Sequence, residues 1–479
     1  MPDDQREVIR FLSRPSSYGP GVERVDIVET HASLVFLAGE RAYKLKRAVT
    51  YPYLDFATAE QRRRICESEL ALNRRTAPAL YLALCALGRT SAGEIGFVAD
   101  GPAVDWVVVM RRFDQALVFD ALARAGRLDA ALMRALTERI AAFHAAAAPR
   151  RDCGGAAALQ AIIEENDRCL RAVREAGFAP EQIDQVRDRS AQRLAATGAV
   201  LDARRMAGKV RRVHGDLHLR NIVLFDGQPT LFDCLEFSET LASIDVLYDL
   251  AFLLMDLEHR GLSDFANLVL NRYLDLTGEE DGLPALPLFL SLRAAIRAHV
   301  GAAALQRAAR PEARQERAAE ARRYLDLAAR LLAPRPRRLV AIGGLSGTGK
   351  STLAAALAPS LGARVLRSDV MRKRLFGVSP ETRLPAEAYG AAVSERVYER
   401  LRREAAATLA AGYSVIVDAV ALRPQERQSF AALAAAAGVA FSGLWLEAPP
   451  EVLAARLDAR RGDASDASVA VLREQLRHD

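Results

Sequence analysis

The chain has 479 residues, of which 51% are apolar and 26% charged, and it carries a net charge of +6. This length suggests about three units of ordinary domain size. The five cysteines form no C-x-x-C pair, and no apolar run approaches the ~20 residues of a membrane span. These features argue against a disulfide scaffold, a zinc site and a membrane protein, and they predict a cytoplasmic protein with reduced thiols.

The basic net charge taken alone would suggest a nucleic-acid partner. However, arginine is interleaved with glutamate along the expected helices, as in residues 312–323, which indicates solvated helix faces and argues against such a partner. Only five of the 66 basic residues are lysine. Because the chain uses arginine wherever either cation would suffice, each lysine marks a place where a compact point charge matters.

Residues 1–113 are predicted to form a small lobe rich in strands. Strand patterns cover 25–29, 34–37 and 42–47, and a hairpin turn lies between the second and the third. The period and the Glu/Arg content of 58–76 predict a helix, and 106–110 predicts a further strand.

Residues 114–332 are predicted to be nearly all helical. A connector is expected over 145–158 and a helical hairpin over 159–205. His144 is expected to be a structural helix residue, and Asp249 opens an apolar helix.

The stretch from Arg212 to Phe237 carries the clearest chemistry, and it reads RVHGDLHLRNIVLFDGQPTLFDCLEF. Two short strands, 222–225 and 231–232, flank an Asp-Gly turn. Asp216, Asn221 and Asp233 are therefore presented by a loop and a hairpin. Two acids and an amide suit phosphoryl transfer from ATP, which needs a base for the acceptor hydroxyl and oxygen ligands for Mg²⁺.

The pattern HGDLHLRN followed by Asp233 resembles the catalytic loop of aminoglycoside phosphotransferases and related small-molecule kinases, which share the protein-kinase fold. The resemblance implies that Asp216 is the catalytic base and that Asn221 and Asp233 hold Mg²⁺. It also implies that His214 supports the loop. Asp249 resembles the buried acid that pins this loop in kinase folds, and for His218 a bracing role and a direct role both stay open.

In that fold the third strand carries a lysine that contacts the ATP phosphates and pairs with a helix glutamate. Lys44 and Lys46 are two residues apart in the strand expected over 42–47, so both side chains lie on the same face. We favour Lys44 as the phosphate-binding lysine, but the pattern does not decide between the two. Glu69 is the expected partner, with Glu67 as the alternative. The loop between the first two strands, where the kinase fold covers the phosphates, has no G-x-G-x-x-G motif. The resemblance implies that the small hydroxyl residues of the turn that ends at Ser33 supply the phosphate contacts instead. The hinge after 106–110 would hold adenine by its backbone.

A Pro/Arg linker over 333–338 precedes alternating strands and helices. The segment GLSGTGKST from residue 344 matches G-x-x-x-x-G-K-S between a strand at 339–342 and a helix at 353–361. Backbone N–H groups of such a loop and the helix N-terminus bind phosphate oxygens. We expect Lys350 to reach the β- and γ-phosphates and Ser351 to bind Mg²⁺. The other loop residues expected at the nucleotide are Gly344, Ser346, Gly347, Thr348, Gly349 and Thr352.

Two further strand patterns, 365–369 and 415–418, each end in an aspartate, which places acids at the edge where open α/β sheets bind ligands. This arrangement resembles the P-loop kinases that include zeta-toxin-like, gluconate-kinase-like and polynucleotide-kinase-like enzymes. The resemblance implies that Asp369 orients or deprotonates the acceptor hydroxyl and that Arg372 places the substrate. Asp418 would contact the metal or its water.

The helix expected over 453–461 carries Arg456 and Arg460 before a flexible loop, which resembles a kinase lid that closes on the transferring phosphoryl group. Kinases of this kind usually continue through an adenine-contacting loop and a last strand, and the sequence to Asp479 shows neither. This difference puts the nucleotide affinity of the second domain in doubt.

The predicted fold is an α+β protein-kinase-like bilobal domain, with lobes 1–113 and 114–332, followed after the linker 333–338 by an α/β P-loop kinase domain with a parallel sheet over 339–479. The whole chain resembles bacterial bifunctional proteins that join an aminoglycoside-phosphotransferase-like domain to a P-loop ATP-binding domain. The resemblance implies a tandem kinase that uses ATP and Mg²⁺ to phosphorylate hydroxyl groups of small molecules. Two alternatives stay open: one active kinase with a nucleotide-sensing P-loop domain, and a kinase of nucleic-acid ends. The sequence identifies neither acceptor nor the oligomeric state.

Overall fold

The chain folds as two units, one formed by residues 1–154 and 208–249 and the other by residues 155–207 and 250–479. The computed structural model describes residues 4–30, 32–51, 54–99, 102–307, 310–459 and 464–477. Within these ranges none of the helices combines the length and the apolarity needed to cross a bilayer.

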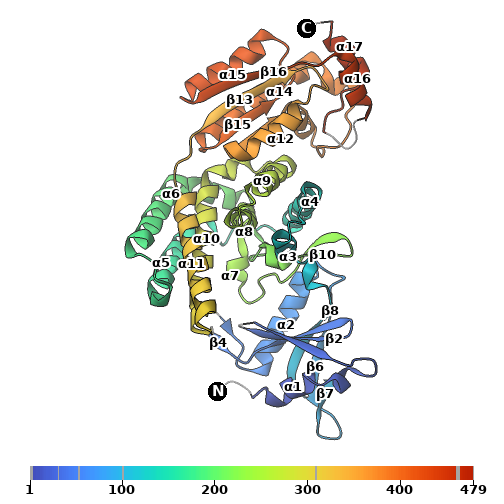
Figure 1. Ribbon diagram of the computed structural model, residues 1–479, viewed down its shortest axis with the longest axis vertical. Helices are drawn as coiled ribbons and strands as arrows, with labels where there is room; N and C mark the ends of the chain where they lie inside the picture. Colours follow the sequence, from blue (N-terminus) through green and yellow to red (C-terminus); the bar gives the residue numbers. More distant parts are fainter. Residues whose placement is uncertain are drawn as a thin grey trace. The chain divides into compact units, whose positions relative to one another are not determined.

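A six-stranded antiparallel sheet begins the first unit, and Figure 1 shows it in blue beside helix α2 (Ala59–Asn73). The order of the strands across the sheet is β1 (Val25–Glu29), β2 (Ser33–Ala38), β3 (Arg41–Lys46), β8 (Ala103–Arg111), β6 (Tyr81–Arg89) and β7 (Ile95–Val98). The strands predicted over 25–29, 34–37, 42–47 and 106–110 are all present; β6 and β7 are additional.

Helix α2 begins with a capping box. The Thr58 hydroxyl accepts a hydrogen bond from the Gln61 backbone N–H at 3.3 Å, and the Gln61 side chain accepts one from the Thr58 N–H at 2.9 Å. This start sets the phase of the helix, so that Glu69 and Asn73, which are four residues apart, lie on its buried face.

The rest of the first unit holds the loop and hairpin singled out by the sequence. Strands β9 (Val210–Arg212) and β12 (Ser243–Asp245) pair antiparallel, and β10 (Ile222–Phe225) pairs with β11 (Gln228–Leu231). The second hairpin strand therefore ends at residue 231, and Asp233 lies two residues beyond it. The other helices and strands of this part are α1 (Arg6–Leu12), β4 (Thr50–Tyr51), β5 (Leu54–Asp55), α3 (Phe119–Arg124), α4 (Ala130–Ala146), α7 (Glu239–Ala242) and the start of α8 (Val246–His259).

Helices dominate the first half of the second unit. They are α5 (Gly155–Ala172), α6 (Pro180–Met206), α9 (Ser263–Thr277), α10 (Leu286–Ala303) and α11 (Pro311–Leu331). Helix α5 starts at Gly155, so the expected connector over 145–158 is shorter than predicted.

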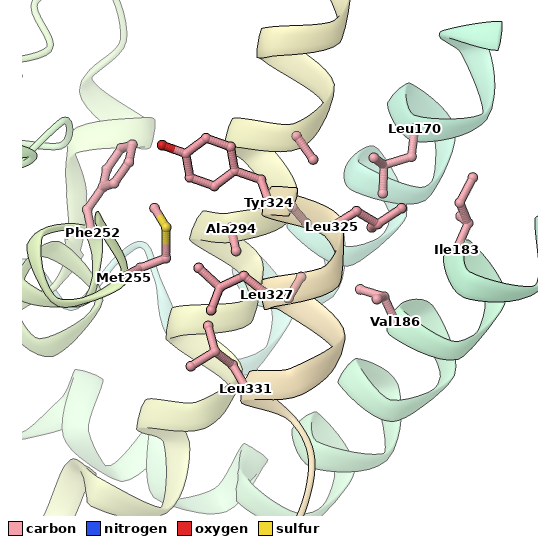
Figure 2. Packing of buried hydrophobic residues seen from close by; sticks show 13 residues of the cluster. Leu170, Ile183, Val186, Phe252, Met255, Ala294, Tyr324, Leu325, Leu327 and Leu331 are labelled. Atoms are coloured by element: carbon pink, nitrogen blue, oxygen red, sulfur yellow. The ribbon is translucent and has the colours of Figure 1, made fainter. Parts of the chain in front are cut away.

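Small residues on α10 let α11 pack closely against it. Ala294 and Ala298 are fully buried, and Leu325 and Leu327 of α11 pack in the same core cluster. Figure 2 shows these leucines beside Tyr324, with Met255 facing the same core. Truncating a buried leucine here to alanine would cost about 2–5 kcal/mol, because the close-packed helices can fill the cavity only in part.

A four-stranded parallel sheet forms the second half of this unit. Its strands lie in the order β14 (Ala363–Arg367), β15 (Ser414–Asp418), β13 (Arg338–Gly344) and β16 (Ala440–Leu446). The helices of this half are α12 (Lys350–Leu361), α13 (Ser368–Leu375), α14 (Ala391–Ala410), α15 (Pro424–Ala436), α16 (Pro450–Ala459) and α17 (Val469–Gln475).

Strands β14, β15 and β13 of this sheet are covered on both faces, whereas the edge strand β16 is mostly exposed. Leu339, Val415 and Val417 pack with residues of α14 and α15 on one face, whereas Val340 and Ile416 pack with α12 on the other. Covering of both faces explains the nearly continuous apolar strands in the sequence.

One predicted element ends earlier than expected. Strand β14 stops at Arg367, and Asp369 is the second residue of α13 rather than the last residue of a strand. An acidic side chain in the first turn of a helix is stabilised by the partial positive charge of the N-terminus, which favours a helix start at this point.

Strand β14 is an edge strand, and a side chain of α9 satisfies its backbone. The Asn271 amide donates to the Ala363 carbonyl at 3.0 Å, and its oxygen accepts from the Val365 N–H at 2.8 Å. Asn271 thus protects the sheet edge from pairing with another chain.

Candidate active sites

Asp249, in the first turn of α8, holds the loop between β9 and β10 through hydrogen bonds to its backbone. The Asp249 carboxylate accepts hydrogen bonds from the Gly215 N–H at 2.8 Å and the His214 N–H at 3.2 Å. His144 Nε2 lies 3.0 Å from the same carboxylate, and both side chains are buried. Asp249 and His144 therefore hold the position of the loop.

Gly215 is required by this packing. Its φ of 82° lies in the left-handed region, and a Cβ there would lie 2.9 Å from the Cβ of Leu235. A side chain at this position would displace the loop or the segment after Asp233.

Asp216 points away from these contacts and toward Asn221. The Asn221 amide donates to the Asp216 carboxylate at 2.8 Å and to the Asp216 backbone carbonyl at 2.9 Å. His218 Nε2 lies 3.3 Å from the same carboxylate, whose side chain is 36% exposed. The structure thus brings together the acid and the amide that the sequence singled out, with His218 beside them.

Asp233 is held by two residues that the sequence analysis did not single out. Its N–H donates to the Tyr81 hydroxyl at 3.1 Å, and the next N–H, of Cys234, donates to the Asn73 side chain at 2.9 Å. The backbone of Asp233 is left-handed, with a φ of 62°. Asn73 follows Glu69 by one helical turn, a spacing that could have indicated it.

Two lysines and three carboxylates form one buried cluster in front of this segment. Lys44 Nζ lies 2.7 Å from Glu69 and 2.5 Å from Asp233, whereas Lys46 Nζ lies 2.6 Å from Glu69 and 2.5 Å from Glu236. Glu67, the alternative partner, instead pairs with Arg63 on the exposed face of α2.

The two lysines differ in accessibility. The side chain of Lys44 is 12% exposed and that of Lys46 only 2% exposed, and the Asp233 side chain beside Lys44 is 41% exposed. Burial opposes the charge of Lys44, but Asp233 and Glu69 outweigh it and raise the pKa of the ammonium group. Burial raises the pKa of the Glu236 carboxyl against the effect of Lys46.

Ser33 begins strand β2 and is 3% exposed. Its N–H donates to the Thr30 hydroxyl at 2.9 Å, and the Thr30 N–H donates to its carbonyl at the same distance. Ser33 therefore belongs to a closed turn at the end of the β1–β2 hairpin.

The phosphate-loop motif of the second unit lies between β13 and α12, as the sequence predicted. Lys350 Nζ donates to the carbonyls of Gly344 and Leu345 at 2.8 and 2.9 Å. The Ser351 hydroxyl donates to Asp418 at the end of β15 at 2.6 Å. A Cβ on Gly347 would lie 3.0 Å from the Leu453 carbonyl, so the loop backbone passes close to α16.

A cavity of about 1500 Å³ opens in front of this loop. Of the residues expected at the nucleotide, those that line it are Ser346, Gly347, Thr348, Gly349, Lys350, Ser351 and Thr352, while Gly344 provides the carbonyl bonded by Lys350. Arg456 also lines the cavity and donates to the Gly347 carbonyl at 3.3 Å. Arg460 lies outside the described residues.

Asp369 and Arg372, which the resemblance places at the acceptor, also line this cavity. Burial raises the pKa of the Asp369 carboxyl, against the effect of a hydrogen bond from Ser465. The Arg372 guanidinium donates to the Ala388 carbonyl at 2.7 Å and stacks on the Tyr389 ring at 4.8 Å from its centroid. The structure therefore brings Asp369, Arg372 and Asp418 into one cavity with the phosphate loop.

Helix α17 also reaches the phosphate loop. The Gln475 side-chain oxygen accepts from the Ser346 N–H at 2.9 Å, and Leu472 packs against Leu345 and Leu453. No sequence signal pointed to Gln475 as a neighbour of this loop.

The donor sets fit Mg²⁺ and ATP by their chemistry. Among the described residues no three His, Cys, Asp or Glu side chains converge as a dedicated metal cage. Mg²⁺ bound with a nucleotide does not need one, because it takes one or two carboxylates together with phosphate oxygens and water. Asp233 with Asn221, and Ser351 with Asp418, offer such oxygen ligands. The N–H groups at the start of α12 suit phosphate.

Comparisons with known proteins match two separate segments of the chain. Residues 52–286 match the Phosphotransferase enzyme family, and residues 339–478 match the AAA domain family. Uncharacterized proteins of Mycobacterium bovis and Mycobacterium tuberculosis are each 33% identical over 455 residues, covering 93% of this chain and 88% of theirs.

Among solved structures, a choline/ethanolamine kinase family protein from Mesorhizobium loti is 14% identical over 68% of this chain and 98% of its own, with a TM-score of 0.40. A gluconokinase from Sinorhizobium meliloti 1021 is 23% identical over 30% of this chain and 76% of its own, with a TM-score of 0.21. The family matches confirm the predicted fold class, and both matched domains are of kinase type, so the chain is an ATP-dependent phosphotransferase. The chain belongs to the family of bacterial proteins that join an aminoglycoside-phosphotransferase-like domain to a P-loop kinase-like domain.

Proposed function

We propose that the chain is a tandem kinase with two Mg²⁺-ATP sites, each of which transfers the γ-phosphoryl group to a hydroxyl group of a small molecule. The observation that supports this proposal is that each unit brings a lysine together with two carboxylates and an amide or hydroxyl oxygen, the groups from which a phosphate contact, metal ligands and a base can be drawn. Asp233, Asn221 and Asp216 lie together in the first unit, and Ser351, Asp418 and Asp369 share one cavity in the second. The functional parts are the lobes 1–113 and 114–332 and the domain 339–479, acting in the cytoplasm.

At the first site, Asp216 takes the proton of the acceptor hydroxyl. Its exposed carboxylate supports this role, and the amide of Asn221 fixes its orientation. Bound Mg²⁺ would neutralise charge on the transferring phosphoryl group, with Asp233 and Asn221 as its protein ligands. His218, at 3.3 Å, braces the base.

Lys44 rather than Lys46 contacts the phosphates in this proposal. Lys44 is the more accessible of the two, and it touches Asp233 directly. Lys46 is enclosed between Glu69 and Glu236, and moving it to a phosphate would take away the cation that lies 2.5 Å from the buried Glu236 carboxylate. Lys46 therefore keeps Glu69 and the segment after Asp233 in place, and Ser33 closes the neighbouring turn.

At the second site, Lys350 would leave the carbonyls of its own loop to contact the β- and γ-phosphates, and Ser351 and Asp418 would hold bound Mg²⁺. Asp369 acts as the base. Burial supports this role because it raises the pKa of the carboxyl and so strengthens it as a proton acceptor. Arg372 orients the acceptor, and Arg456 lies beside the phosphate loop, where it can approach the transferring group.

A screen of ADP release over sugars, aminoglycosides, nucleosides and oligonucleotides tests the proposal. It is run on the full chain with Asp216→Asn and, separately, with Lys350→Ala, so that each variant reports the other site. We expect each to retain turnover with a small-molecule hydroxyl acceptor. ADP release that requires oligonucleotides would favour the nucleic-acid-end kinase. If one of the two variants releases no ADP with any acceptor, the proposal of two active sites is contradicted.

A second candidate function, control of the first site by the P-loop domain, is favoured by one set of contacts within the second unit. Glu280, three residues after α9, accepts from Arg364 of β14 and from Arg374 of α13, each at 2.8 Å. Arg374 and Asp369 share helix α13. Arg374 Nε also donates to the Asp275 carbonyl of α9 at 3.2 Å, so displacement of α13 on acceptor binding would be transmitted to α9.

A further inference from the structure

A hydroxyl group of the chain itself lies on the acceptor side of the P-loop site. The Ser465 side chain forms a hydrogen bond with the Asp369 carboxylate, and both residues line the cavity that contains the phosphate loop. Because Asp369 is the group we assign as base, Ser465 holds the position that an acceptor hydroxyl would take.

The neighbouring residue keeps Ser465 in this position. The Asp466 carboxylate accepts hydrogen bonds from the Leu384 N–H at 2.9 Å, from the Tyr389 hydroxyl and from Lys373 Nζ. The Lys373 side chain is 1% exposed, so the anchor is a buried ion pair. Lys373 is also one of the five lysines of an arginine-rich chain, at a place where a compact charge fits a narrow site.

The same base lies within electrostatic reach of the metal side of the site. Asp418 acts on Asp369 through its charge, and Asp418 accepts the hydrogen bond of Ser351 in the phosphate loop at 2.6 Å. Ser465, Asp369, Asp418 and Ser351 therefore link the acceptor side of the cavity to the phosphate side.

We propose that Ser465 is a modification site, phosphorylated within the same molecule by ATP bound at the P-loop. The bond between the γ-phosphorus and the β,γ-bridging oxygen breaks, and a bond from that phosphorus to Ser465 Oγ forms. The hydroxyl proton passes to Asp369, and ADP leaves. This inference rests on the proposed kinase function of the same site.

The modification would open the site to external acceptors. Phosphoserine carries a charge of about −1.5 to −2 at neutral pH. Asp369 repels that charge and Arg372 in the same cavity attracts it, so the phosphorylated side chain would leave its hydrogen bond with Asp369 and the acceptor position there.

Mass spectrometry of the full chain tests the inference. Asp216→Asn protein, which leaves only the P-loop site active, is first treated with phosphatase and then incubated with Mg²⁺-ATP. Fragmentation of the tryptic peptide 462–473 separates Ser465 from Ser468. We expect one phosphate on Ser465, formed at a rate independent of protein concentration, and its loss in the Lys350→Ala and Ser465→Ala variants. The Ser468→Ala variant, altered in the same segment, should retain it.

A nucleotide titration of the same preparations separates this inference from the function on which it rests. If nucleotide binding depends on Lys350 but Ser465 stays unmodified, the inference is overturned and the proposed kinase function is not affected. Absence of any such binding would overturn both. Phosphate on Ser465 that forms equally in Lys350→Ala protein, or at a rate that rises with protein concentration, would also overturn modification by the molecule's own P-loop.

Discussion

The two lysines to which we assign phosphate binding, Lys44 and Lys350, are held in different ways. Lys44 bonds to Glu69 and Asp233, which are 25 and 189 residues away in the sequence. Lys350 bonds to carbonyls only six and five residues away, in its own loop. The first site is therefore assembled by tertiary packing and the second by local backbone geometry. A change in distant packing should disturb the first site more than the second.

The largest expected effect is the loss of turnover when the proposed base of the first site is removed without a change in packing. Asp216→Asn should lower turnover at that site ~10²–10⁴-fold while ATP affinity stays nearly unchanged, because a general base acts in the transition state and little in the ground state. The control is Asp226→Asn, in the exposed turn of the same hairpin, where the side chain makes only a surface pair with Arg111. Steady-state kinetics and an ATP titration of both variants decide the point. Wild-type turnover in Asp216→Asn with an identified acceptor would show that this loop is not catalytic.

The same contrast explains what the sequence could predict. The P-loop motif, its flanking strand and helix, and the loop HGDLHLRN with Asn221 are local patterns, and the structure has them where the sequence placed them. The choice between Lys44 and Lys46 was not predictable. Both side chains lie on the same face of β3, and they differ only through the three-dimensional positions of their neighbours, Asp233 beside Lys44 and Glu236 beside Lys46.

Other differences have equally specific causes. Strand β6 reads YLALCALGR, an apolar run without alternation, because its side chains pack into two apolar clusters, Tyr81 and Leu84 in one and Leu82 and Leu87 in the other. Tyr81 and Gln475 contact their sites through single hydrogen bonds across long sequence separations, which leave no pattern in the sequence, whereas Asn73 is marked only by its spacing from Glu69. Asp369 was expected at a strand end, but the residues Ser368-Asp369 start a helix.

The second prediction sharpens the comparison within the buried cluster. Lys46→Met should lower the free energy of unfolding by about 3–5 kcal/mol, because Glu69 and Glu236 lose the cation that both contact. Lys44→Met should instead weaken ATP binding. Denaturant unfolding and ATP titration of the two variants measure both effects, and the double variant Lys46→Met/Glu236→Gln should recover part of the stability. Equal and negligible effects of both single variants would contradict the assignment of this strand.

A smaller effect is expected from pH on the stability of the helical part of the second unit. Burial lowers the pKa of His299 from 6.5 to about 4, and His299 Nε2 lies 3.1 Å from the Asn166 side-chain oxygen. Because the unfolded chain binds a proton on this histidine at a higher pH than the folded chain, stability is fully present above about pH 6.5 and is lost as the pH falls toward 4. The loss should reach on the order of 2–3 kcal/mol.

Thermal unfolding of wild-type and His299→Gln protein between pH 7.5 and pH 4.5 measures this contribution. The variant should show a shallower decline over this range, because it lacks the group that takes up the proton. Parallel curves for the two proteins would contradict a neutral, buried His299.

The central claim is that the two sites work independently, and the most direct test is turnover at the first site in Lys350→Ala protein. Removal of the lysine should abolish nucleotide binding at the P-loop. Lys44, Asp216, Asn221 and Asp233 need nothing from the second site, so ADP release with an acceptor of the first site should match wild type. Allosteric control would require a coupling free energy of ~1–3 kcal/mol, which corresponds to a roughly 5–150-fold change in affinity. The account predicts kinetic constants equal to those of the wild-type protein, and a change of about tenfold or more would contradict it in favour of a regulatory P-loop domain.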